Sequence, residues 1–220
     1  MKKNSTRRIY FPNNIQPTTS PIINPQSSYA SVQNSSYKNI SLEIVPNRQV
    51  HIDSLEVVSD KSVYIDSTIE RVSQWFLSLS SMSNKKLQKL CYYAYCWFIV
   101  FFNDIESITE DNISDIRTLC ADRFQAWIHG PVSPRLYHRY KEYGWHDIPQ
   151  TASKPEFSYE LESLLEQVWE AYGVFTADEL ETISHGEMPW KNARKGYRDG
   201  EACSNEISDY DILQYYSSLG

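Results

Sequence analysis

From about residue 67 onward, apolar residues recur with the three- and four-residue spacing of an α-helix. The longest stripe comprises Leu87, Leu90, Cys91, Ala94, Trp97, Phe98 and Phe101. The first turns of this helix have a polar side, formed by Lys85, Lys86, Gln88 and Lys89. The uncharged run from Cys91 to Phe102 has 12 residues, whereas a membrane span needs about 20. We therefore expect a central helix that starts at Ser83 or Asn84, ends near Asn103 and is surrounded by other helices.

Capping signals and the same spacing predict further helices. They are expected over 68–80, from Ser133 to Gly144, over 158–172, from Thr176 to Gly186, from Pro189 to about Arg194, and from Ser208 onward. The segments that begin at Ser67 and at Thr176 have the form of capping boxes, in which two side chains each satisfy a free backbone amide. In the helix that Ser133 and Pro134 open, the expected buried side consists of Leu136, Tyr137 and Tyr140.

Three regions depart from this pattern. Residues 124–128 alternate between apolar and polar positions, which predicts a short extended segment that Gly130-Pro131 closes with a turn. Residues 104–120 show only a short helical pattern around Ile113, Ile116 and Leu119, and residues 40–65 contain alternating runs compatible with short strands. The predicted fold class is mainly α: a compact multi-helix domain with a minor extended or β element and a disordered N-terminal tail.

Composition divides the chain into three parts. Residues 1–40 contain 23 Asn, Ser, Thr, Pro or Gln residues, together with five basic residues and no acidic one. This composition predicts a disordered basic tail, because the segment has too little apolar surface to bury. Residues 41–66 are expected to form a variable linker with short strands, and residues 67–220 the helical domain. Since the net charge of the whole chain is −7 and that of the tail is +5, residues 41–220 carry −12.

The charge, the cysteine content and the lack of known motifs argue against several classes of function. The acidic balance argues against direct binding of nucleic acid, and no apolar stretch follows the basic N-terminus, as a secretory signal would require. The chain has four cysteines but no Cys-x-x-Cys or His-x-x-x-His pair and no glycine-rich phosphate loop. We therefore expect no cofactor, no metal site and no membrane association, and a reducing cytoplasm as the compartment.

The candidate chemistry is sparse. His129 precedes Gly130-Pro131, and a histidine at a rigid turn could act in acid–base catalysis. No nucleophile or carboxylate lies near it in the sequence, so a ring that braces the turn is the favoured interpretation. His185 is expected at a helix C-terminus, where an imidazole can satisfy free carbonyls.

Aromatic residues offer a different kind of site. Trp127, Tyr137, Trp169 and Trp190 could anchor a protein partner, since interface hot spots favour Trp and Tyr. Aromatic side chains at such spacings more often belong to a core. We predict no catalytic residue, and the partner-binding candidates are Trp127, His129, Tyr137 and Trp190.

Four stretches of the body, taken in order, resemble the Panacea domain of SocA-like antitoxins, which is also described for phage-associated GepA-type proteins. Residues 86–94 are similar to its Lys-Leu-Gln-Lys-Leu-x-Tyr-Tyr-Ala helix, and residues 124–132 to its Ala-Trp-x-x-Gly-Pro-Val turn. The match continues through Pro134, Tyr137, Tyr143 and Gly144. Residues 184–190 are similar to its Thr-His-x-Glu-x-Pro-Trp ending, and the resemblance covers about 67–218. The motif residues expected to hold the fold are Leu87, Leu90, Tyr93, Gly130, Pro131, Gly144, His185 and Pro189.

The resemblance implies an antitoxin that neutralises a cognate toxin by direct protein–protein binding. The toxin is expected to be encoded by a neighbouring gene in a bacterium or prophage. One alternative is an adaptor that delivers a toxin or other client to a protease. Two weaker alternatives are an enzyme centred on His129 and a transcriptional repressor, which the acidic body and the lack of a helix-turn-helix segment disfavour.

Overall fold

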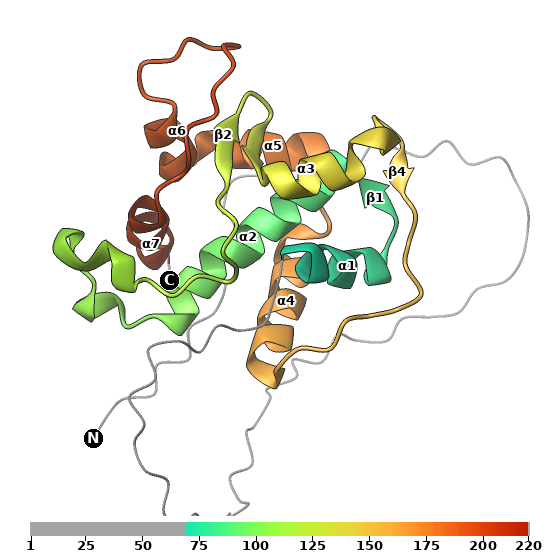
Figure 1. The fold of residues 1–220 in the computed structure, drawn as a ribbon, viewed down its shortest axis with the longest axis horizontal. Helices are drawn as coiled ribbons and strands as arrows, with labels where there is room; N and C mark the ends of the chain where they lie inside the picture. The colour runs from blue at the N-terminus through green and yellow to red at the C-terminus, as the bar shows by residue number, and fades with distance from the viewer. Residues whose placement is uncertain (1–68, 220) are drawn as a thin grey trace, which may run out of the picture. The chain divides into compact units, whose positions relative to one another are not determined.

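The computed structural model describes residues 69–219, so the expectations for residues 1–68, among them the tail, the linker and the capping box at Ser67, lie outside it. The α-helices are α1 (Ile69–Leu79), α2 (Asn84–Phe102), α3 (Pro134–Tyr140), α4 (Tyr159–Tyr172), α5 (Ala177–Gly186), α6 (Met188–Ala193) and α7 (Asp209–Ser217). Three short 3-10 helices are η1 (Ile105–Ser107), η2 (Glu110–Asp115) and η3 (Lys141–Tyr143). The mainly helical fold class is confirmed for this part of the chain (Figure 1).

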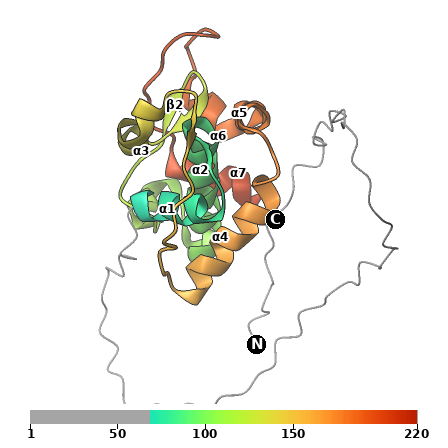
Figure 2. The ribbon, with the colours of Figure 1, turned by 90° about the vertical axis from the view of Figure 1, so that its right-hand side faces the viewer.

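Helix α2 is the centre of the core. Every residue from Leu87 to Val100 is buried, so the helix has no solvent-facing side along these turns. It packs against α1, α4, α5 and α7, and Figure 2 shows it enclosed by them. Its start, with Ser83 as N-cap, and its end at Asn103 agree with the sequence prediction.

The other helix starts follow from local capping chemistry. The hydroxyl groups of Ser133, Ser158 and Ser208 each accept a hydrogen bond from a backbone amide in the first turn of the helix that follows. At Thr176 the full capping box forms: the Thr176 hydroxyl accepts from the Glu179 amide, and the Thr176 amide donates to the Glu179 carboxylate at 2.8 Å. Since these contacts span only three residues, the sequence predicts the starts of α3, α5 and α7 correctly.

Two small antiparallel sheets connect the helices. Strand β1 (Met82–Ser83) pairs with β4 (Asp147–Ile148), and β2 (Gln125–Trp127) pairs with β3 (Gly130–Val132). The predicted extended segment is thus confirmed, but the predicted turn at Gly130-Pro131 is wrong. Trp127 pairs with Gly130, so the turn consists of residues 128–129, and Gly130-Pro131 lies in the second strand. Proline is tolerated there because β3 is an edge strand, whose outer side has no ladder to complete.

Tertiary packing also overrides three expectations of burial or helix extent. Tyr137, expected on the buried side of α3, is 39% exposed, because Leu136 and Tyr140 fill the contact with the core. Gln88 and Lys89, expected on a polar face of α2, are buried. The helical pattern of 104–120 is present as η1 and η2, but it ends at Asp115, before Ile116 and Leu119.

Within residues 69–219, none of the helices combines the length and the hydropathy that crossing a membrane would require.

Candidate partner-binding surface

The buried side chain of Lys89 holds the β2–β3 hairpin against α2. The Lys89 side chain extends from α2, and its Nζ donates a hydrogen bond to the carbonyl oxygen of Pro131 at 3.2 Å. Burial lowers the pKa of this ammonium group to about 7. Gly130 has a φ of +92° and lies directly on the lysine, since a β-carbon at this position would meet Lys89 Cε at 2.7 Å. Both the backbone conformation and the close approach to the lysine therefore favour glycine at position 130.

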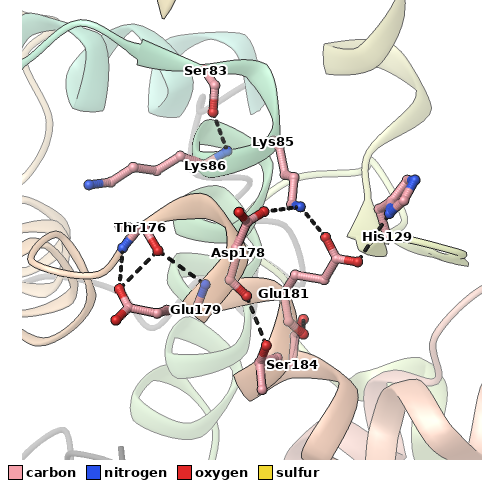
Figure 3. A network of polar contacts seen from close by, with 10 residues as sticks. Ser83, Lys85, Lys86, His129, Thr176, Asp178, Glu179, Glu181 and Ser184 are labelled. Atoms are coloured by element: carbon pink, nitrogen blue, oxygen red, sulfur yellow. Dashed lines mark hydrogen bonds and ion pairs between the residues drawn. The ribbon is translucent and has the colours of Figure 1, made fainter. Parts of the chain in front are cut away.

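A second set of polar contacts holds the tip of the hairpin (Figure 3). One carboxylate oxygen of Glu181, on α5, lies 3.0 Å from Nδ1 of His129, and the other forms an ion pair with Lys85. Lys85 also bonds Asp178 at 2.6 Å. Burial raises the pKa of Glu181, but the hydrogen bonds from Lys85 and His129 lower it more, so that the carboxyl stays ionised. The His129 ring is thereby oriented while 69% of its side chain remains exposed.

The geometry around His129 offers little support for catalysis. The only hydrogen bond of its ring to another described residue is the one to Glu181. The Ser184 hydroxyl, one turn after Glu181 on α5, donates instead to the carbonyl of Glu181, and Ser184 is fully buried. Among the described residues no hydroxyl or thiol bonds the His129 ring, so the pair has no nucleophile held as in a hydrolytic triad.

Aromatic side chains gather on the hairpin beside this network. The rings of Trp127 and Tyr137 meet edge to face with centroids 4.9 Å apart. Trp190 donates from Nε1 to the carbonyl of Trp127 at 3.1 Å and stacks on His185 at 4.0 Å. The four residues that the sequence singled out for partner binding, from β2, the hairpin turn, α3 and α6, therefore surround one hairpin. We refer to Trp127, His129, Tyr137 and Trp190 as the hairpin surface.

The residues assigned to the fold occupy different places. Leu87, Leu90 and Tyr93 are fully buried on α2; Gly130, Pro131 and Pro189 are buried; His185 is half-buried; and Gly144, with a φ of +57°, ends η3. Sequence reasoning missed Lys85, Lys89 and Glu181, which position the hairpin. Their partners are 40 or more residues away, so no local pattern reveals them.

A buried acid lies where α5 meets α6. The Glu187 side chain accepts a hydrogen bond from Tyr216 Oη at 2.7 Å within the core. Burial raises the pKa of this carboxyl from 4.5 to about 8, and the bond from Tyr216 offsets this only in part. Glu187 is therefore protonated in the folded protein at neutral pH.

Glu187 predicts a specific pH dependence of stability. Because its pKa is higher in the folded than in the unfolded state, the folded state binds the extra proton between pH 4.5 and 8. The free energy of unfolding should therefore fall as pH rises, by about 1.4 kcal/mol per pH unit relative to Glu187→Gln. Urea titrations of both proteins between pH 5 and 7 would measure this slope. Lys89, whose pKa of about 7 lies at the upper end of this range, is present in both proteins, so its contribution cancels in the comparison. Parallel pH profiles would contradict the prediction.

No metal or thiol chemistry emerges from the described residues. Residues 69–219 contain no cluster of three or more His, Cys, Asp or Glu side chains suited to hold a metal ion. All four cysteines are unpaired and buried. Burial raises the pKa of the Cys91 and Cys96 thiols well above their ordinary value, which keeps them unreactive.

Comparison with known proteins gives one finding. Residues 87–191 match the family model described as "Antitoxin SocA-like, Panacea domain". This segment runs from Leu87 on α2 through the hairpin to α6, so it includes all four residues of the hairpin surface and two of the side chains that hold it, Lys89 and Glu181, whereas Lys85 lies just before it. Neither the curated proteins nor the solved structures contain a match to the chain.

Proposed function

We propose that this protein, whose residues 87–191 match the SocA-like antitoxin Panacea domain, neutralises a cognate toxin by binding it directly through the hairpin surface. The proposal gives the protein no catalytic step of its own. It places the complex in the cytoplasm, where four unpaired cysteines stay reduced.

The observation that carries the choice of surface is the convergence of four separated residues on one hairpin. Trp and Tyr are the residues most enriched at interface hot spots. Here Trp127 and His129 lie on the hairpin, to which Lys89 bonds at Pro131 and Glu181 at His129. Tyr137 and Trp190 lie on α3 and α6 and contact Trp127. A surface fixed before binding loses little conformational entropy when the partner docks. The negative charge of the body would also attract a toxin with a basic face.

Co-expression with the product of the adjacent gene tests the proposal. We expect the neighbour to arrest growth alone, and this protein to restore growth and co-purify with it. Rescue accompanied by disappearance of the neighbour protein would indicate a proteolytic adaptor instead. A harmless neighbour that forms no complex would contradict the assignment of that neighbour as toxin, and an unbiased pull-down that recovers no toxic protein would contradict the proposal itself.

Tyr137→Ala tests the hairpin surface. Tyr137 is 39% exposed, so its removal should change the melting temperature little and weaken the complex at least tenfold, as expected of about 1.4 kcal/mol or more at a hot spot. Tyr159→Ala, on α4, is the matched control because Tyr159 is 84% exposed and lies outside the hairpin surface. Calorimetric titration of each purified variant with the purified toxin would measure the two affinities. Equal affinities for the two variants would place the interface elsewhere.

A further inference from the structure

The chain between α2 and β2 begins with a strongly acidic stretch. Residues 104–116 include five acidic residues and no Lys, Arg or His. All five acidic side chains are exposed, and none forms an ion pair with another residue in the described part of the chain. They are Asp104, Glu106, Glu110, Asp111 and Asp115. Because like charges held close together repel one another, this stretch is stabilised when cations bind to it.

The neighbouring elements do not compensate this charge. Helix α7 packs on η2, and neither α7 nor the part of α2 from Leu90 onward contains a basic residue. Arg117 is exposed and adds one cation, whereas Arg123, the next basic residue, is paired with Asp209 on α7. Five carboxylates against one guanidinium leave residues 104–117 with a net charge of −4. Figure 1 shows this stretch, in green, beside α7.

Apolar side chains lie among the carboxylates. Ile113, on the same short helix as Glu110 and Asp111, is 40% exposed. The side chains that are only partly buried against the core on either side of the α2 C-terminus are Phe101, Phe102, Ile105 and Ile108. The surface therefore combines uncompensated negative charge with apolar area that is open to solvent.

Hydrogen bonds hold this surface in shape. The Asn103 side chain bonds the amide of Arg117 at 2.8 Å and its carbonyl at 2.9 Å, which closes the ends of the stretch on one another. Inside it, the Asn112 side chain accepts from the amide of Thr109 at 2.6 Å and donates to the carbonyl of Ser107 at 2.9 Å. A binding partner would meet the carboxylates on a backbone that is already ordered, which lowers the entropic cost of docking.

The N-terminal tail contains a segment with the complementary chemistry. Residues 2–11 include four basic residues, and the last two of these directly precede Ile9-Tyr10-Phe11, the only run of three large apolar residues in residues 1–40. The tail has no acidic residue to compete for these cations. The 57 residues between this segment and α1 would span about 40 Å as a flexible coil. A domain of this size has a diameter of about 40 Å, so the segment can reach the acidic stretch.

We propose that the acidic corner, defined as Asp104, Glu106, Glu110, Asp111, Ile113 and Asp115, binds residues 2–11 of the same chain. The four cations of the segment would pair with the carboxylates, and its aromatic residues would cover Ile113. A metal ion fits less well, because residues 69–219 contain no group of three or more His, Cys, Asp or Glu side chains suited to hold one. Both halves of the contact belong to this chain, so the inference does not depend on the proposed toxin.

Photo-cross-linking of the full-length protein tests this contact. With p-benzoylphenylalanine in place of Tyr10, we expect cross-links within one chain to residues 101–117, located by digestion and mass spectrometry. The combined reversals Glu106→Lys, Glu110→Lys and Asp111→Lys should lower the cross-linking yield at least threefold. Raising the salt concentration to about 0.5 M should act in the same direction, because exposed ion pairs are weak individually and are screened by salt.

A matched variant separates the acidic corner from the overall negative charge of the body. The combined reversals Glu160→Lys, Glu166→Lys and Glu170→Lys change the same number of exposed carboxylates on α4 and should leave the yield unchanged. Because all six substituted side chains are exposed, we expect the melting temperature of both variants to equal that of the parent protein. Cross-links that avoid residues 101–117, an equal loss of yield in both variants, or cross-links between two chains would each overturn the proposal.

Discussion

Replacing Gly130 by alanine is expected to lower the free energy of unfolding by about 3 kcal/mol or more, because it combines backbone strain with a clash in the core. The φ of +92° disfavours any side chain, and a β-carbon would lie 2.7 Å from Lys89 Cε and 2.8 Å from Ser184 Oγ. Both side chains are buried, so a shift of either would disturb the hydrogen bonds that Lys89 and Ser184 make beneath the hairpin. Thermal unfolding would show a decrease of about 6–12 °C for this domain size.

Gly196→Ala provides the matched control for this prediction. Gly196 has nearly the same φ, +93°, but no atom lies within 4 Å of the place a β-carbon would take. Its substitution isolates the backbone strain, which costs about 1–2 kcal/mol. The difference between the two variants then measures how tightly the hairpin packs on Lys89. Equal losses would show that the hairpin does not rest on the lysine as the structure has it.

Trp97→Ala is expected to destabilise the domain by about 3–5 kcal/mol, the range for removing a large aromatic side chain from a core. Trp97 is fully buried on α2. Its ring meets those of Phe101 and Tyr216 with centroids 5.6 and 5.4 Å apart, and its Nε1 donates to Tyr172 Oη at 3.2 Å. The variant would leave a cavity and an unsatisfied hydroxyl among α2, α4 and α7. Urea titration at constant pH would measure the loss.

The variant Trp97→Phe separates the contribution of aromatic packing from that of the hydrogen bond to Tyr172. Phenylalanine keeps most of the packing but cannot bond Tyr172, so we expect a smaller loss of about 1–3 kcal/mol. A loss below about 1.5 kcal/mol for Trp97→Ala would fall outside the range for a tightly packed core position. Such a result would contradict the central place that the structure gives α2.

The Panacea resemblance, which rests on residues 86–94, 124–132 and 184–190, agrees with the family match over 87–191. Each stretch is a continuous run of residues: the first lies in α2, the second forms the β2–β3 hairpin, and the third joins α5 to α6. Their order along the chain therefore carries the family assignment without knowledge of how they contact one another. The match by itself identifies no partner.

By itself, the sequence determined the helices and the central core. Ser133, Thr176 and Ser208 mark helix starts through hydrogen bonds that span three residues, and the stripe that begins at Leu87 predicts the buried face of α2. Such signals are local, because capping and periodicity depend only on neighbours within a turn or two.

Only the tertiary structure decided how the candidate surfaces form. It placed the hairpin turn at residues 128–129, buried Lys89 beneath Gly130, and exposed Tyr137. It also joined His129 to Glu181, 52 residues away, and to Lys85 beyond it. The residues next to Lys89 in the sequence do not distinguish a lysine buried under the hairpin from a lysine exposed to solvent. Its environment is set by segments that approach only when the chain folds, because long-range packing outweighs local preference.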